Sequence, residues 1–483
     1  MHYTASYKNR YRLSLPVRAS FWYTAAAVLE RGAALIFTPL FTRLLAPGEY
    51  GVYSLYTSFM GIFTVFITLE LSGNIVYRGL SGFRGREAEF MRAALGLISL
   101  SALLFAVVLS VFGAQLSAIT GLSIQALSFL AIQVYLNGIV NLYTARERYR
   151  YRYYRAILPN LAISVLSPLL AFVITRFFGV GAPSRIYAFI VVTALIALPL
   201  AASVMEGGIR FSPNALRLAC SVSLPLLPHF IAASVSAQAG RAIVGIFRGE
   251  GELAVYSVVF SLGFVFSLVT GGLLSSLSPW ISRKLSHGGG YSFSSVTTVH
   301  NTVNGLLPPI CIASLIFLCF SREALFILAP PEYQAALLCI VPITLFVLLN
   351  FVLAVQTSII LYYDAGAMMS VASVVSALLN LSLNLLLTPV YGYIAAAIIQ
   401  AGGALLNLLL YSLVIRVRSG ARLSYSRYIF PLVLTAAVGT LIIAMSGAPV
   451  ARGLLALALT LLFIIRAAPL RKFIFDRSNA NMG

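Results

Sequence analysis

Ionisable side chains lie inside long apolar runs, where they could bind a charged ligand or carry ions. Glu30 and Arg31 fall in the first run, and Glu70, Asn74 and Arg78 follow at i, i+4 and i+8 in the second. A charge at bilayer depth is costly and marks a functional site by default. We assign Glu70 and Glu30 as candidates for ion coupling. The structural alternatives are an ion pair with another helix for Arg31, a permanent pair with an arginine for Glu70, and a surface anchor for Arg78.

A second polar face combines an amide with arginines. Gln238, Arg241 and Arg248 are spaced by 3 and 7 residues, so they share one side of a helix. Arg241 is deep in its run and has no acidic neighbour in the same helix. Guanidinium groups hold phosphate oxygens bidentately. We therefore expect Arg31, Arg78 and Arg241 to attract a phosphate group.

Further amides recur at helical spacing, and with the arginines they complete the candidate binding set. They are Asn137 and Asn141, Asn380 and Asn384, and Gln400. Amides either join helices by hydrogen bonds in lipid or line a wet cavity that suits hydroxyl-rich ligands, and both interpretations stay open. The four cysteines have no metal-ligand or disulfide spacing, so we expect no metal site and no catalytic site.

Composition indicates that these side chains are positioned by membrane helices. The chain has 483 residues, of which 60% are hydrophobic and 10% charged, whereas a soluble domain has about 25% charged residues. We expect an all-α polytopic membrane protein of about 14 transmembrane helices. The expected spans are 20–44, 52–78, 91–113, 122–144, 157–178, 184–204, 220–247, 252–278, 302–321, 335–361, 366–388, 390–415, 428–446 and 450–467. Residues 1–18 have no apolar core, so we expect the first span, and no signal peptide, to direct insertion.

The basic residues predict how the chain is oriented. Most of the 33 Lys and Arg residues fall in every other loop, which places both termini in the cytoplasm. The run Arg146–Arg155 interleaves Arg with Tyr, a pattern also found where RNA bases stack. Its position favours a cytoplasmic loop with interfacial tyrosines, so the net charge of +20 does not indicate nucleic acid.

An internal repeat divides the chain. Gly48–Phe59 reads GEYGVYSLYTSF and Gly251–Leu262 reads GELAVYSVVFSL, identical at half of the aligned positions. Each copy closes one span and opens the next from the same side, which predicts two parallel halves that could rock by alternating access. We expect a six-helix bundle over 1–210, a second over 211–418, and two additional helices with a basic tail over 419–483.

A family resemblance agrees with this layout. Phe37–Tyr53, FTPLFTRLLAPGEYGVY, resembles the first helix pair of the Wzx-type polysaccharide (O-antigen) flippases, in the multidrug/oligosaccharidyl-lipid/polysaccharide exporter superfamily. Ser223–His229 and Pro389–Ala397 are similar to further segments of that family. Many relatives have Asp-Arg where this chain has Gly240–Arg241, and Glu70–Asn74 adds a membrane acid, so the coupling ion, proton or sodium, stays open.

The resemblance implies a function in the bacterial cytoplasmic (inner) membrane. It implies flipping of an undecaprenyl-pyrophosphate-linked oligosaccharide for surface polysaccharide or lipopolysaccharide, without a cofactor. Partners would be the lipid-linked oligosaccharide, membrane lipids, a glycan polymerase and a chain-length regulator. A cation-coupled multidrug antiporter of the same superfamily would need acids in its cavity. A membrane glycan polymerase or ligase would need a substantial outer loop, and the expected outer loops are short, so we expect no enzyme.

Overall fold

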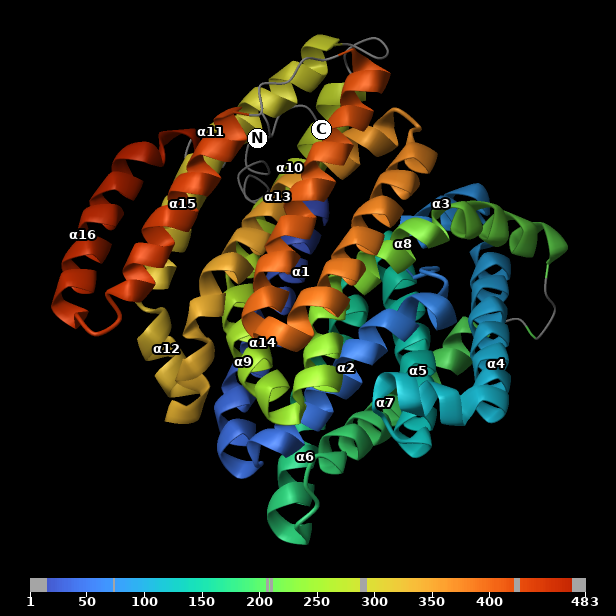
Figure 1. The fold of residues 1–483 in the computed structure, drawn as a ribbon. Helices are drawn as coiled ribbons and strands as arrows, with labels where there is room; N and C mark the ends of the chain where they lie inside the picture. The colour runs from blue at the N-terminus through green and yellow to red at the C-terminus, as the bar shows by residue number, and fades with distance from the viewer. Residues whose placement is uncertain are drawn as a thin grey trace, which may run out of the picture.

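The described residues form an all-helical protein, as the sequence predicts. The computed structural model describes residues 15–72, 74–205, 208, 212–286, 293–420 and 426–470, and these ranges contain no β-strand. The elements are α1 (Leu15–Leu44), α2 (Pro47–Thr68), α3 (Asn74–Gly82), α4 (Glu87–Thr120), α5 (Ile124–Tyr149), α6 (Tyr153–Phe178), α7 (Pro183–Val204), α8 (Pro213–Arg248), α9 (Glu250–Val265), α10 (Ser267–Ser286), α11 (Phe293–Cys319), α12 (Ser321–Leu328), η1 (Pro331–Cys339), α13 (Ile340–Tyr362), α14 (Gly366–Ser419), α15 (Ser426–Ala444) and α16 (Pro449–Arg466) (Figure 1).

Most of these helices are long and apolar enough to cross a membrane. Twelve helical segments of the described ranges meet that criterion, and Tyr428–Ala444 is a shorter apolar helix. One of the twelve, α14, has 54 residues and contains a non-helical residue, Gly392, with φ 64° and ψ −151°. It therefore includes two of the spans expected from the sequence. The multi-pass membrane protein is confirmed, while the count of fourteen spans and the domain boundaries stay predictions.

The second expected span, 52–78, is not one continuous helix, so this prediction is wrong. Helix α2 ends at Thr68, and the next two residues, Leu69 and Glu70, have φ of 51° and 52°. The N–H of Leu69 donates to the carbonyl of Val65 and caps the helix in the left-handed conformation. A new helix, α3, begins at Asn74. Glu70 therefore does not share a helix with Asn74 and Arg78.

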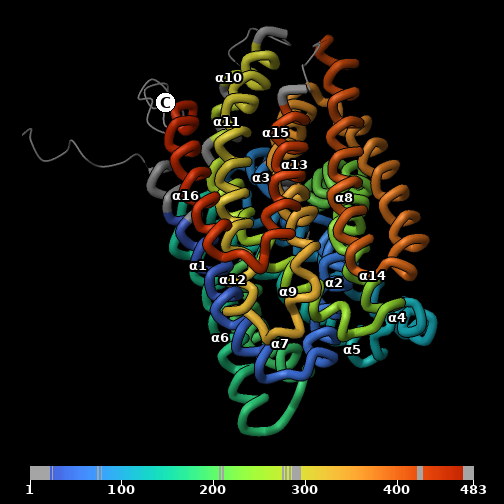
Figure 2. Tube along the Cα trace, turned by 60° about the vertical axis from the view of Figure 1, so that its left-hand side comes forward, coloured from blue at the N-terminus to red at the C-terminus, as the bar shows by residue number. Residues whose placement is uncertain are grey.

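The core is joined at one end of the molecule and divided at the other. We call the end at which α1 meets α2 the outer end, following the predicted orientation. Helix α12, the end of α6 and the start of α7 lie at this end (Figures 1 and 2). One cluster of buried side chains, which includes Tyr50, Tyr256 and Tyr333, joins both halves, mostly towards the outer end. Towards the inner end, two separate clusters hold mainly α3–α7 and mainly α10–α14.

The two repeat copies meet inside this shared core. Helix α2 packs against both α8 and α9, so the two helices that carry the repeat copies, α2 and α9, contact each other. Helices α15 and α16 pack against α11 at one edge of the molecule (Figure 1). With the halves held together at the outer end, space between them opens on the inner side of this contact.

Candidate functional site

A cavity of about 640 Å³ lies between the two halves. Helix α1 contributes Arg31, α8 contributes Gln238 and Arg241, and α9 and α13 contribute Phe264 and Asn350. Three of the side chains that the sequence singled out are thus brought together from two helices far apart in the chain. The wall combines cationic, amide and aromatic groups.

Both arginines of this cavity are held by uncharged partners. Arg31 donates a hydrogen bond from Nη1 to Oγ of Ser267, and its Cζ lies 5.4 Å from the centre of the Phe264 ring. Arg241 donates from Nη2 to Oε1 of Gln238 and lies 4.6 Å from the centre of the Phe260 ring. The Nε of Arg241 is buried and has no hydrogen-bond partner among the described residues.

No carboxylate of the described residues forms an ion pair with Arg31 or Arg241. The structural alternative for Arg31, an ion pair with another helix, therefore finds no partner in these ranges. A guanidinium in a low-dielectric region attracts an anion strongly. The cavity presents two such groups without an ion-pair partner among the described residues, so it can bind an oxyanion.

A second cavity, of about 310 Å³, adjoins the first through Arg241. It is lined by α1, α2, α6 and α7 of the first half and by Arg241 and Ser257 of the second. Glu30, predicted to couple ions, lies in its wall together with Arg185. Ion coupling by Glu30 and by the half-buried Glu70 stays a prediction.

Sequence reasoning did not single out Arg185, because it lies at the start of the expected span 184–204, where a basic residue is common. Its Cζ lies 3.7 Å from the centre of the Tyr53 ring, 4.4 Å from Phe41 and 5.5 Å from Tyr50. Nothing near Arg185 in the sequence indicates these contacts, since α1 and α2 supply the rings. The only available signal was the tyrosine shared by the two repeat copies, Tyr53.

The amides of α14 bond to one another and to their own helix. Asn384 donates from Nδ2 to the carbonyl and Oδ1 of Asn380, at 2.9 and 3.1 Å. Asn380 donates to the carbonyl of Ile399 at 3.2 Å, and Thr388 donates to Oδ1 of Asn384 at 3.0 Å. The bond from Asn380 to Ile399 connects the segments of α14 on either side of Gly392, whereas the other three bonds stay within the first segment. Asn380 thus matches the helix-joining alternative that the sequence left open.

The remaining predicted residues are four polar side chains on α3, α5 and α14. Gln400 is buried in α14, whereas Asn137 is partly exposed and Asn141 exposed on α5. None of the three lines either cavity. Arg78 is in α3, but its side chain lies outside the described residues. Substrate contacts by these four residues stay predictions.

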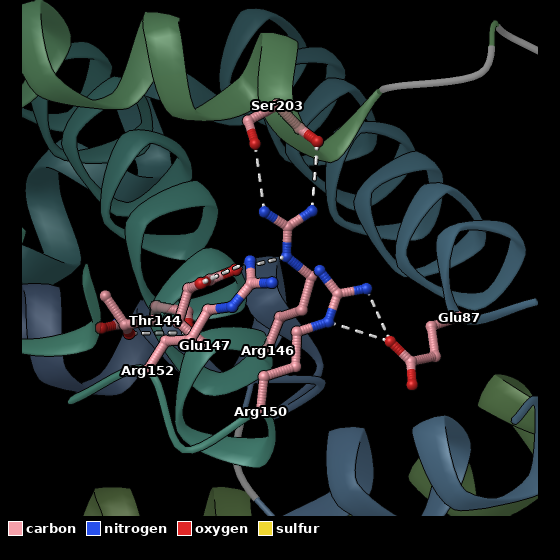
Figure 3. A network of polar contacts seen from close by, with 8 residues as sticks. Glu87, Thr144, Arg146, Glu147, Arg150, Arg152 and Ser203 are labelled. Carbon is pink, nitrogen blue, oxygen red and sulfur yellow. Dashed lines mark hydrogen bonds and ion pairs between the residues drawn. The ribbon is translucent and has the colours of Figure 1, made fainter. Parts of the chain in front are cut away.

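The basic run that begins in the last turn of α5 forms a network of ion pairs (Figure 3). Arg146 pairs with Glu147 at 3.1 Å and donates two hydrogen bonds to Ser203 at the end of α7. Arg150 pairs with Glu87 at 2.6 Å, at the start of α4. Arg152 lies 3.8 Å from Glu147. The network joins the ends of α4, α5 and α7, so these side chains have a structural role.

Comparisons with known proteins agree with this architecture. Residues 17–284 match the model of a family described as polysaccharide biosynthesis protein. The curated proteins contain no match. Among solved structures, the lipid II flippase MurJ in an inward closed conformation is similar at 13% identity and a TM-score of 0.68, over 94% of this chain and 99% of that one.

Two transporters of the MOP superfamily are also similar. An inward-facing multidrug resistance transporter of the MATE family has 14% identity and a TM-score of 0.63, over 88% of this chain and 98% of that one. A Pyrococcus furiosus transporter, described by the reverse polarity of its binding pocket, has 14% identity and a TM-score of 0.59, over 88% and 96%. At such identities these likenesses show the fold.

Proposed function

Because the chain belongs to the polysaccharide biosynthesis protein family and has the fold of MOP-superfamily flippases and transporters, we propose that it flips a lipid-linked oligosaccharide. The substrate class is an undecaprenyl-pyrophosphate-linked oligosaccharide, moved across the bacterial cytoplasmic membrane for surface polysaccharide. A glycan polymerase and a chain-length regulator would act on the product. Both termini would lie in the cytoplasm.

The observation that carries this proposal is the pair of arginines without carboxylate partners, Arg31 and Arg241, in the cavity between the halves. Their planar donors suit the oxygens of a pyrophosphate. Gln238 and Asn350 in the same wall offer amide groups to sugar hydroxyls. The isoprenoid chain stays in the lipid, so only the polar head group has to enter the cavity.

Alternating access follows from the way the halves are joined. They share a core towards the outer end and have separate cores towards the inner end. Substrate enters from the inner side, and rocking the halves about their contact would break the outer contact and form an inner one. A proton or sodium gradient would drive this cycle through Glu30 and Glu70, and their Gln variants should lose the dependence on that gradient.

A multidrug antiporter is the second candidate, and the charges of the cavity disfavour it. A cationic drug would need carboxylates in the larger cavity, and no acidic residue lines it among the described residues. Uptake of a cationic dye by proteoliposomes separates the two functions. We expect no dye uptake, together with transfer of a synthetic lipid-linked oligosaccharide to the outer leaflet without chemical change, which also separates a flippase from a polymerase.

The direct test replaces the two arginines. Arg31→Ala and Arg241→Ala should each lower the transport rate at least tenfold, since each removes a charged hydrogen-bond donor. Arg176→Ala is the matched control, because Arg176 is exposed at the outer end of α6 and lines neither cavity. Wild-type transport by both cavity variants would overturn the proposal.

A further inference from the structure

Three arginines lie at different depths below the outer end. Arg31 precedes the outer end of α1 by about 20 Å, Arg241 precedes that of α8 by about 10 Å, and Arg185 follows the outer end of α7 by about 3 Å, at 1.5 Å per residue. Measured from the outer end of its own helix, each arginine therefore lies closer to that end than the one before. The three arginines come from different helices, so their order does not follow from the spacing of residues along one helix.

The two cavities connect these arginines in the same order. The larger cavity is lined by Arg31 and Arg241, and the smaller one by Arg241 and Arg185. Arg241 thus lines both. An anion held between Arg31 and Arg241 has a polar cavity ahead of it that ends at a third guanidinium.

The smaller cavity has hydrogen-bonding groups that lack partners. Nη1 of Arg185 is buried without a hydrogen-bond partner, as are Oγ of Ser167 and Oγ of Ser257 among the described residues. Both serines are 4% exposed and line this cavity. A buried donor without a partner is unfavourable, because it has lost its hydrogen bonds to water and gained none in the protein. A bound group with several acceptor oxygens would satisfy these donors together.

Arg185 also lacks a counter-ion, since it forms no ion pair with a described carboxylate. Its three ring contacts are cation–π attractions. They fix the orientation of the guanidinium without neutralising its charge. The aromatic rings thus position the guanidinium of Arg185, and its charge stays available to a bound anion.

We propose that Arg185 is an exit-side binding site for phosphate oxygens, which reach it from Arg31 by way of Arg241. This inference rests on the proposed function. Glu30 lines the inner part of the same cavity and repels an anion there, which favours movement towards Arg185. Binding of moderate strength at successive sites lets a charged group enter and also leave.

The test compares binding with transport. Purified Arg185→Gln in proteoliposomes should bind the synthetic lipid-linked oligosaccharide with a Kd within twofold of wild type, because Arg31 and Arg241 remain. Its transport rate should fall at least tenfold, and Arg185→Lys, which keeps the charge, should regain part of it. Arg176→Gln, an exposed arginine at the same end of the membrane, should behave as wild type.

The outcomes separate this inference from the proposed function. Wild-type transport by Arg185→Gln, with transport lost in Arg31→Ala and Arg241→Ala, overturns the exit site alone. An equal loss of substrate binding in all three variants also overturns it, because Arg185 would then belong to the entry site. If inorganic pyrophosphate protects wild type against thermal unfolding but not Arg185→Gln, while transport is unchanged, Arg185 binds free anions only. If Arg185→Gln does not fold, Arg185→Lys is the variant to measure. Wild-type transport and unchanged pyrophosphate binding by Arg185→Lys would overturn the inference, because the guanidinium of Arg185 would then not be needed to bind phosphate oxygens.

Discussion

The backbones of α2 and α9 touch where Gly51 meets Glu250. A β-carbon on Gly51 would overlap the carbonyl group of Glu250 and lie 2.8 Å from its Cα. Gly51 belongs to the first repeat copy, and Glu250 directly precedes the second. The two halves are thus joined at the outer end by main-chain packing that only glycine permits.

Gly51→Ala should weaken this contact. The two helices would have to separate, because the atoms in the way are backbone atoms, and overpacking of this kind costs about 1–3 kcal/mol. We expect a lower Tm in detergent and slower transport. Gly251→Ala is the matched control: a β-carbon there meets nothing within 4 Å, so its Tm should stay equal or rise. Equal Tm values for Gly51→Ala and wild type would show that α2 and α9 are not held together at this point.

Hydropathy was sufficient to predict the all-helical, multi-pass fold. The expected span 184–204 corresponds to α7, Pro183–Val204, because an apolar run flanked by polar turns determines both ends. The break after Thr68 was missed, since it depends on the left-handed conformation of Leu69 and Glu70 inside an apolar stretch. Periodicity does not detect such a turn.

The site was predicted in part for a similar reason. Arg31 and Arg241 stand out because each interrupts an apolar run, and the structure places both at one cavity. Arg185 does not stand out, because it lies two residues inside a helix end, where basic residues are common. Its environment comes from Phe41, Tyr50 and Tyr53, so only tertiary packing reveals it.

Asn384→Ala tests whether the amides of α14 are structural. Asn384 accepts a hydrogen bond from Thr388 and donates to Asn380, so its loss leaves buried groups unpaired at a cost of about 1–3 kcal/mol. We expect a lower Tm and a substrate Kd within twofold of wild type. A raised Kd at unchanged Tm would instead support contact with the sugars.

Glu147→Gln tests the network at the inner ends of the helices. Glu147 is 1% exposed and lies between Arg146 and Arg152. Its neutralisation leaves the buried Arg146 without its anion and should cost about 3 kcal/mol in the free energy of unfolding. Glu89→Gln is the control, since its pair with Arg86 is on the surface and contributes at most about 1 kcal/mol. Chemical denaturation of both variants in detergent compares them, and equal losses would show that burial does not strengthen the network.

The ion pair between Glu323 and Arg452 should make stability depend on pH. Arg452 is 4% exposed and donates to both carboxylate oxygens of Glu323, at 2.5 and 3.0 Å. The hydrogen bonds from Arg452 lower the pKa of Glu323 below its usual value. A carboxyl whose pKa is lowered by folding stabilises the protein above its unfolded pKa, about 4.3, and this contribution is lost as the pH falls through the folded pKa.

Glu323→Gln should therefore lower the Tm at pH 7, and the difference from wild type should shrink as the pH falls below about 4. The pair connects α12 to α16, so the loss reports the attachment of the last helix to the second half. Glu332→Gln is the control, because Glu332 is exposed and forms no ion pair among the described residues. Thermal unfolding of the three proteins at pH 7 and pH 3.5 is the measurement. A difference that stays the same at both values would mean that the charge of Glu323 does not stabilise this contact, and that its packing alone does.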